Sequence, residues 1–297
     1  MFEKKLTILT PTYNRASTLG RLFESLCKQT RQEFTWLVVD DGSTDGTDAL
    51  ICSYQRKSII DIKYFYQSNG GKHTALNRGI EICDTPLLMI VDSDDYLLPD
   101  AVSQIIRMHI KYQNDSTIGC YSFLRCYPDG TPVLSIDCDE VVSNYIDYRI
   151  KGNRPGDMAE VFITRWLKKF RFPEFNNEKF LSEDVVWIEL GKYARTVYIK
   201  TPVYVCEYLE GGLTATDKKA KFGSPLGSML RGKKLMSKEC GLKANIRGAI
   251  IYDCYQSVAG RKTPPGLKAD NIYQKILICF MKPISKYYLR KWRKEID

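Results

Sequence analysis

The sequence of 297 residues, with 44% hydrophobic and 27% charged side chains, has the composition of an ordinary folded protein with one large core or two modest ones. No stretch approaches the roughly 20 apolar residues that span a bilayer, and the first residues lead straight into a predicted strand. We therefore expect neither a membrane span nor a signal peptide. Ten scattered cysteines and two histidines, without a Cys-x-x-Cys pair, argue against a zinc site and for reduced cytoplasmic thiols.

The net charge of +9 is divided unevenly along the chain. Residues 1–217 carry 25 Lys and Arg against 30 Asp and Glu, whereas residues 218–297 carry 19 against 5. This division predicts a catalytic domain over 1–217 and a basic, helical C-terminal extension over 218–297 that meets an anionic surface.

Strands and helices are predicted to alternate over residues 1–92. Apolar runs typical of buried strands cover residues 6–10, 34–39, 62–66 and 87–91, and helical patterns begin at Ser17 or Thr18, at Ser43 or Thr44 and at Thr74. The alternation favours parallel β-α-β units in a doubly wound sheet. Because ligands bind beyond the carboxyl ends of such strands, we expect the segments near Pro11, Asp41 and Asp92 to converge on one edge.

Three carboxylates directly follow the last of these strands: Asp92, Asp94 and Asp95. Packed beside a buried strand they repel one another, and a divalent cation with oxygen ligands relieves that repulsion. Mg²⁺ or Mn²⁺ bound by one or two carboxylates completes its shell with water and substrate phosphates. The pattern therefore indicates a metal–diphosphate site. The alternative is a solvated acidic turn before the helix that starts near Pro99.

A glycine-rich segment from Asn69 to Thr74 contains Gly-Gly-Lys but lacks the spacing of a P-loop. Tyr66 stands where the first glycine is required, and His73 follows the lysine, so we reject a Walker A site. The glycines permit a tight loop at a helix start, where Lys72 meets a diphosphate. The alternative is an ordinary surface lysine.

The middle of the chain is less regular. Further elements are predicted as strands over 119–127 and 132–136 around a turn at Pro128-Asp129-Gly130, a strand running into a helix over 161–168, a helix over 185–193, and strands over 197–199 and 203–208. His109, in the helix after Pro99, is interpreted as a structural or surface residue.

Four segments now stand together: Thr10-Pro11-Thr12-Tyr13-Asn14-Arg15, Val39-Asp40-Asp41-Gly42-Ser43-Thr44-Asp45, Asp92-Ser93-Asp94-Asp95 and Glu183-Asp184. In this order and spacing the chain resembles the family 2 glycosyltransferases over residues 1–210. The resemblance implies the GT-A fold, an α/β fold with a Rossmann-like, mostly parallel sheet that binds a nucleotide sugar. It also implies transfer of a sugar from a nucleoside-diphosphate sugar, with UDP-sugar favoured, to an acceptor with inversion at the anomeric carbon.

The resemblance further implies which residues contact the nucleotide. By family position these are Pro11, Thr12, Tyr13, Asp41, Lys72, Asn77, Asp92 and Ser93. The turn that ends at Tyr13 rests against the base, unless it only ends the strand. Asp41 matches the carboxylate that reads the base, and because a carboxylate only accepts, it suits the N3–H of uracil. The alternative for this segment is a turn with a helix cap, the role that we expect for Asp45.

In the family's metal motif the final acid, here Asp94, is the usual ligand of Mn²⁺ or Mg²⁺, and Asp95 is the alternative. Asp92 contacts the ribose or takes part in the metal site directly or through water. The metal bridges both phosphates and offsets the charge that develops on the leaving nucleoside diphosphate.

Inverting transfer needs a base that takes the proton of the acceptor hydroxyl. Asp184 is the residue that matches the family's base. The alternative is a structural acid at a helix N-terminus, where the dipole favours it, and Glu183 or Ser182 can fill that role instead.

The basic end of the chain is predicted to form an amphipathic helix from Asn271 onward. A helical projection gathers Ile276, Leu277, Phe280, Ile284 and Tyr288 on one side and places Lys275, Lys282, Lys286, Arg290 and Arg293 largely opposite. Pro283 would kink this helix. Such segments commonly lie on anionic membrane surfaces. The alternatives are a helix packed on the catalytic domain with a solvated basic face and, more weakly, nucleic-acid binding, which we do not expect.

The resemblance thus implies a metal-dependent hexosyltransferase at the cytoplasmic face of the membrane, acting on a glycan or lipid-linked acceptor in bacterial surface polysaccharide synthesis. A polyprenyl-phosphate sugar transferase is the alternative within the family, and a non-catalytic carbohydrate-binding protein is the alternative outside it. A sugar-phosphate nucleotidylyltransferase shares the fold, but the sequence lacks its glycine-rich opening after the first strand.

Overall fold

The computed structural model describes residues 4–207, 213–260 and 263–295 and divides the chain into two compact units. The sheet unit comprises residues 1–144, 155–171 and 193–207, and the helical unit comprises residues 145–154, 172–192 and 208–297. The predicted boundary at residue 217 does not coincide with this division, because two segments from the middle of the chain pack with the C-terminal helices. A catalytic domain over 1–217 stays a prediction about function.

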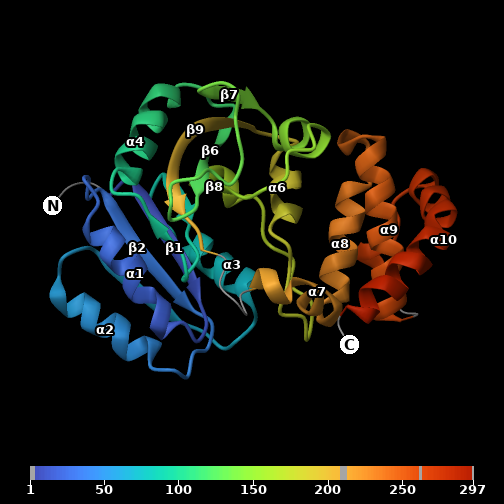
Figure 1. The fold of residues 1–297 in the computed structure, drawn as a ribbon, viewed down its shortest axis with the longest axis horizontal. Helices are drawn as coiled ribbons and strands as arrows, with labels where there is room; N and C mark the ends of the chain where they lie inside the picture. Colours follow the sequence, from blue (N-terminus) through green and yellow to red (C-terminus); the bar gives the residue numbers. More distant parts are fainter. Residues whose placement is uncertain (1–3, 208–212, 261–262, 296–297) are drawn as a thin grey trace. The chain divides into compact units, whose positions relative to one another are not determined.

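The described strands of the sheet unit form a single nine-stranded sheet (Figure 1). They are β1 (Leu6–Thr12), β2 (Phe34–Asp40), β3 (Ile62–Tyr66), β4 (Leu87–Ile90), β5 (Tyr96–Leu97), β6 (Ile118–Cys126), β7 (Glu140–Ser143), β8 (Met158–Ile163) and β9 (Arg195–Val205). Their order is β3-β2-β1-β4-β8-β6-β9-β5, and β7 pairs with β9.

Strands β1 to β4 pair in parallel, which confirms the predicted β-α-β units. They are connected by α1 (Ala16–Cys27), α2 (Thr47–Lys57) and α3 (Lys72–Ile82). Helices α1, α2 and α4 (Ala101–Tyr112) bury their apolar sides on one face of the sheet, around the fully buried Trp36. Helix α3 covers the other face at close range, since a Cβ on Gly79 would lie 2.2 Å from Cδ1 of Leu9. Both faces of β1, β2 and β4 are covered, which explains why these three strands are mostly apolar and fully buried.

The carboxyl ends of β1, β2 and β4 meet at one edge of the sheet. Thr12 lies opposite Asp40, and the N–H of Asp41 donates to the Thr12 carbonyl over 2.8 Å. The N–H of Val91 donates to the Leu9 carbonyl over 2.9 Å. The predicted convergence of the three segments that follow these strands is confirmed.

The second half of the sheet is mixed. Strand β8 is antiparallel to β4 and β6, and it runs into α5 (Thr164–Leu167), as the strand-to-helix pattern predicted. The two strands predicted over 197–208 are one strand, β9, whose pairing with β6 is irregular at Pro202. The strand predicted over 132–136 is wrong. In this described segment, Pro132 forms an isolated bridge with Cys126 at the end of β6, and the residues that follow form no strand. Strand β8 pairs with β6 from Cys120 to Leu124 and β9 pairs with its other side, so only the end of β6 at Arg125 and Cys126 remains for this segment.

Asp45 accepts hydrogen bonds from the first residues of two helices. Oδ2 of Asp45 accepts from the N–H of Ala16 over 2.9 Å, and its Oδ1 accepts from Oγ1 of Thr47 over 2.6 Å. Helix α1 therefore begins earlier than predicted, and α2 begins later. The structural role expected for Asp45 is confirmed.

The helical unit is an all-helical assembly in its described parts. Its elements are a π-helix (Ile146–Lys151), α6 (Asp184–Leu190), α7 (Leu213–Gly223), α8 (Pro225–Leu235), a 3₁₀ turn (Lys238–Cys240), α9 (Leu242–Ala259), a second 3₁₀ turn (Pro265–Leu267) and α10 (Ile272–Lys294). Helices α8 and α9 approach closely, since a Cβ on Gly232 would lie 2.7 Å from the Gly248 carbonyl oxygen. Helix α10 contacts α9 and continues through Pro283. Across the ranges that the structure describes, every helix is too short or too polar to cross a membrane.

Candidate active site

The turns that follow β1 and β2 are tied together by hydrogen bonds. The N–H of Asn14 donates to Oγ of Ser43, and the N–H of Thr44 donates to Oδ1 of Asn14, each over 2.8 Å. Asn14 has a positive φ of 52°, which asparagine tolerates better than most residues. The two turns therefore form one connected rim at the carboxyl edge of the sheet.

Among the three residues predicted to rest against a base, Tyr13 presents its side chain to solvent. Tyr13 as a whole residue is 50% exposed, whereas Pro11 and Thr12 are buried in β1. Oγ1 of Thr12 has no hydrogen-bond partner among the described residues. A buried hydroxyl of this kind is costly unless water or a ligand satisfies it. Tyr13 is therefore the one of these three residues whose side chain a ligand can reach.

The carboxylate of Asp41 is 3% exposed and fastens the glycine-rich loop. Its Oδ2 accepts from the N–H of Gly71 over 2.7 Å, and its Oδ1 accepts from the N–H of Gly70 over 2.9 Å and from Nε2 of Gln67 over 2.8 Å. The residue that the resemblance assigns to the base thus holds the loop that precedes α3. Its contact with the base stays a prediction.

The glycine-rich loop positions a lysine beside the acidic segment, Asp92-Ser93-Asp94-Asp95. Gly71 has a φ of 97°, which favours glycine, and Lys72 is the first residue of α3. Nζ of Lys72 lies 2.5 Å from Oδ1 of Asp92, so the structure brings these two predicted residues together. Asn77 lies further along α3 and is buried. Lys72 is therefore not a detached surface lysine.

The three predicted metal ligands have different surroundings. The side chain of Asp92 is 27% exposed. Asp94 is half-buried, and no described residue donates a hydrogen bond to its carboxylate. Asp95 is buried, and its Oδ2 accepts from the hydroxyl of Tyr204 over 2.7 Å while its Oδ1 accepts from the N–H of Glu207 over 3.3 Å. Asp92 and Asp94 are consequently more available to a ligand than Asp95.

The charges of this segment follow its contacts. Burial, and then the neighbouring carboxylate of Asp92, raise the pKa of Asp95 to about 6. Burial also acts against the anion of Asp92, but the Lys72 ammonium and the Arg125 guanidinium outweigh it and lower the pKa of Asp92. Asp92 is thus held as an anion, whereas the carboxyl group of Asp95 takes up a proton as the pH falls through about 6.

Three residues that the sequence analysis did not single out support the acidic segment. The hydroxyl of Tyr204 also accepts from the N–H of Asp92 over 3.0 Å, and the Arg125 guanidinium lies 4.2 Å from the centroid of the Tyr204 ring. Arg21 donates to the carbonyl of Asp94 and pairs with Glu207. The available sequence signal for Arg125 was a charged residue within the mostly apolar strand predicted over 119–127. The sequence around Tyr204 carried no signal that distinguishes it from other tyrosines in a strand.

The donor set of this segment suits a hard divalent cation. Carboxylate oxygens are the ligands that Mg²⁺ and Mn²⁺ prefer, and Asp92 and Asp94 supply them at a partly exposed position. Within the described ranges, no three His, Cys, Asp or Glu side chains are grouped so as to hold a metal ion by themselves. These residues therefore fit a cation that takes its remaining ligands from water and a diphosphate. Ser93, between them, is buried.

Asp184 belongs to the helical unit, whereas the other predicted site residues belong to the sheet unit. It is the first residue of α6, and its two carboxylate oxygens accept from Nε of Arg231 over 3.0 and 2.7 Å. The side chain of Asp184 is 15% exposed. The arginine fixes the orientation of this carboxylate. A role as base stays a prediction.

The comparisons with known proteins agree on the kind of protein. The family model described as "Glycosyl transferase family 2" matches residues 7–157, just over half of the chain. The "Uncharacterized glycosyltransferase YibD" of Escherichia coli is 30% identical over 62% of this chain and 55% of its own length. The "Validoxylamine A glucosyltransferase" of Streptomyces hygroscopicus is 35% identical over 35% of this chain and 25% of its own length. The chain spans 17% to 55% of the first curated relatives that it matches.

Solved structures show the same fold. S. aureus TarS 1–349 in complex with UDP has a TM-score of 0.61 at 18% identity, with 97% of this chain and 87% of that chain covered. The mannosyltransferase PcManGT from Pyrobaculum calidifontis, in complex with GDP-Man and Mn²⁺, has a TM-score of 0.59 at 17% identity, with 98% and 84% covered. The predicted α/β fold of the GT-A class is confirmed, together with the C-terminal helices.

Proposed function

Because the chain belongs to glycosyl transferase family 2, we propose that it is an inverting hexosyltransferase that uses a nucleoside-diphosphate sugar, a UDP-sugar in the first place. Family membership supports sugar transfer in general. The donor class is supported by the structural neighbours, since TarS is known with UDP and UDP-GlcNAc, and PcManGT with GDP-Man. We propose that the acceptor is a glycan or a lipid-linked acceptor.

The observation that carries this proposal is the pairing of Lys72 with Asp92, directly beside the half-buried Asp94. A diphosphate with a bound cation requires a protein cation for its free oxygens and carboxylates for its metal. Lys72 at the start of α3 supplies the first, in a place where backbone N–H groups also favour anions. Asp92 and Asp94 supply the second.

The nucleotide site is assigned as follows. The ring of Tyr13 stacks on the base, Thr12 and Pro11 form the floor of that turn, and Asp41 reads the base while it fixes the glycine loop. Lys72, with Asn77 behind it in α3, holds the diphosphate.

Asp94 with Asp92 would hold Mn²⁺ or Mg²⁺, with Asp95 as the alternative ligand, and Ser93 lies within the same turn. When bound, the cation neutralises the charge that develops on the leaving nucleoside diphosphate. The Tyr204 hydroxyl keeps Asp92 and Asp95 in place before the cation binds. The Mn²⁺ of PcManGT supports a divalent metal for this family.

Asp184 is proposed as the general base. The oxygen of the acceptor hydroxyl bonds to the anomeric carbon, the bond from that carbon to the diphosphate breaks with its electron pair on the phosphate oxygen, and the hydroxyl proton passes to Asp184. Arg231 orients the carboxylate for this transfer. Attack opposite the leaving group inverts the anomeric configuration.

We further place the enzyme in the cytoplasm, at the inner face of a bacterial membrane, in the synthesis of a surface polysaccharide. The bacterial relatives and the basic residues 218–297 support this placement. The membrane contact is developed below.

The test is a screen of nucleotide sugars with the full chain and Mn²⁺, in which nuclear magnetic resonance follows the anomeric form of the released or transferred sugar. We expect turnover of an α-linked UDP-sugar to give the β product first, and Asp94→Ala to abolish it. The matched control is Asp137→Ala, which removes the same charge from an exposed loop residue. An α product would refute inversion, and full activity of Asp94→Ala would refute the metal assignment.

A further inference from the structure

Helix α10 packs with a narrow face and turns its apolar side outward. The residues that it buries are Gln274, Ile278 and Ser285. The apolar residues on the opposite side are exposed by 71%, 49%, 74% and 65% at Ile272, Ile276, Phe280 and Tyr287. An amphipathic helix of a globular protein normally buries its apolar side. In α10 that side is left uncovered by the described chain.

A row of cations borders this apolar stripe. Lys275, Lys282, Lys286 and Arg293 are separated by seven, four and seven positions, so at 3.6 residues per turn they share one side of α10, between its packed face and the stripe. A contiguous exposed apolar surface edged by one sign of charge marks an interaction site rather than ordinary surface. The partner must therefore be apolar and anionic at once.

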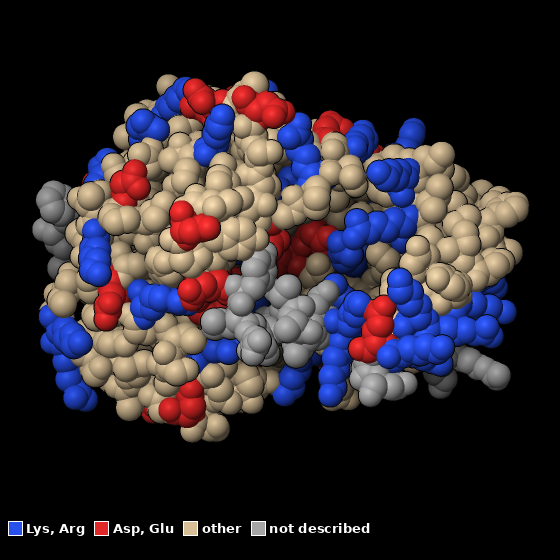
Figure 2. Space-filling model, viewed as in Figure 1, with Lys and Arg blue, Asp and Glu red and all other residues tan. Residues whose placement is uncertain are grey.

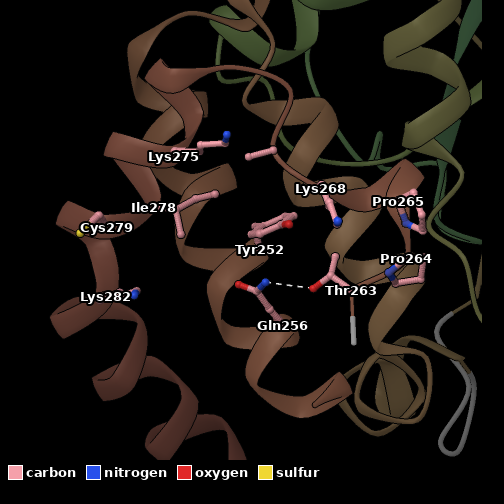
Figure 3. Close-up of a pocket in the computed structure, with 11 residues that line it drawn as sticks. Tyr252, Gln256, Thr263, Pro264, Pro265, Lys268, Lys275, Ile278, Cys279 and Lys282 are labelled. Carbon is pink, nitrogen blue, oxygen red and sulfur yellow. Dashed lines mark hydrogen bonds between the residues drawn. The ribbon is translucent and has the colours of Figure 1, made fainter. Parts of the chain in front are cut away.

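Two of these lysines also line an open groove of about 890 Å³ beside α10. Figure 3 shows Tyr252 of α9 on its floor, between Lys275 and Ile278 of α10 and the segment that carries Lys268. Over the described residues, the groove lysines Lys268, Lys275 and Lys282 have no carboxylate within ion-pair distance. Three ammonium groups around one groove, none of them in an ion pair among the described residues, suit phosphate groups.

We propose that α10 lies flat on an anionic lipid bilayer, with the stripe of Ile272, Ile276, Phe280 and Tyr287 in the headgroup–acyl boundary and the lysine groove against the lipid phosphates. The helix has 23 residues and so extends for about 35 Å along the surface. The alkyl stems of Lys275 and Lys282 lie beside the stripe while their ammonium groups reach the headgroups. This inference specifies the membrane contact of the proposed function and does not depend on the nucleotide chemistry.

Charge complementarity favours a bilayer as the occupant. Residues 218–297 carry 19 Lys and Arg against 5 Asp and Glu, and on the face drawn in Figure 2 blue side chains gather over the lower part of the helical unit. Nucleic acid would be bound by the cations but leaves four large apolar side chains in water. Basic, apolar helices that lie in the interface plane satisfy both requirements with one partner.

The experiment is flotation of the full chain with vesicles of phosphatidylcholine alone or with 30% phosphatidylglycerol. We expect binding to the anionic vesicles and none to the neutral ones. Phe280→Ser should weaken binding roughly tenfold through lost apolar burial, and the double variant Lys275→Gln with Lys282→Gln roughly 25-fold, at about fivefold for each lysine. Absence of binding to the anionic vesicles would overturn the proposal.

Matched control variants lie elsewhere on the helical unit. Leu242→Ser removes an apolar side chain that is 66% exposed on α9, and Lys243→Gln removes an exposed charge beside it. Both should bind like the unchanged chain, and equal losses in the controls would contradict the assignment to α10. UDP binding is measured on every variant. Lost vesicle binding with intact UDP binding identifies α10 as the membrane element, whereas a chain that floats but never binds UDP contradicts only the proposed catalysis.

Discussion

Substitution of Tyr204 by Phe tests whether the acidic segment is held in place before any ligand arrives. Tyr204 is fully buried, and its hydroxyl donates to Asp95 over 2.7 Å and accepts from the N–H of Asp92 over 3.0 Å. A hydrogen bond to a charged group contributes about 1.5–3 kcal/mol and a neutral one about 1 kcal/mol. Loss of both hydrogen bonds should lower the free energy of unfolding by about 3 kcal/mol. No packing loss adds to this, because phenylalanine keeps the ring against Arg125.

The assays for this variant are urea denaturation and calorimetric titration of UDP with Mn²⁺. We expect a lower urea midpoint with an unchanged slope and several-fold weaker binding, because Asp92 and Asp95 lose their common anchor. Tyr66→Phe is the control, since that side chain is 62% exposed on β3. If Tyr204→Phe matched the control in both assays, the hydroxyl would not organise the segment and the reasoning would be refuted.

Three further substitutions probe separate parts of the account. Lys72→Met should weaken UDP binding roughly 10- to 100-fold in calorimetry, because a charge-assisted contact to the diphosphate is lost; unchanged affinity would place Lys72 outside the site. Asp184→Asn should lower kcat roughly 10²- to 10⁴-fold and leave UDP affinity unaltered, and retained turnover would exclude it as the base. Gly232→Ala should destabilise the chain by about 1–3 kcal/mol in thermal unfolding, because the new Cβ would lie 2.7 Å from the Gly248 carbonyl. An unchanged Tm would show that α8 and α9 can separate without cost.

The sequence predicted the parallel half of the sheet well because local pattern decides it. The strand predicted over 62–66 has those bounds in the structure, and the strand that begins at Phe34 extends by one residue to Asp40. Strand β2 is buried along its whole length, so its sequence is mostly apolar, whereas β3 is an edge strand with Tyr66 62% exposed. In both strands, the strand-length pattern and the polar residues that follow it mark the ends. For the same reason the segments beyond them could be placed at one edge.

The remainder depends on contacts that a local pattern does not contain. The segment 132–136 has a strand-like sequence, but β8 already pairs with β6 as far as Leu124, which leaves only the end of β6 for this segment. The hydrogen bonds of Tyr204 with Asp95 and of Arg231 with Asp184, each within its own unit, join residues that are 109 and 47 positions apart. The sequence shows that α10 has an apolar side but not which side packs. In the structure, α10 packs through the face of Gln274, Ile278 and Ser285 and leaves the apolar side exposed.

We expect a nucleoside diphosphate to bind where Lys72 meets the acidic segment, with a divalent cation held between the diphosphate and the carboxylates of Asp92 and Asp94. Calorimetric titration of UDP into the full chain, with and without Mn²⁺, tests it most directly, with Asp94→Ala beside Asp137→Ala. We expect tight UDP binding that requires Mn²⁺ and is lost in Asp94→Ala alone. Equal UDP affinity with and without Mn²⁺, or an undiminished response of Asp94→Ala to the metal, would contradict it.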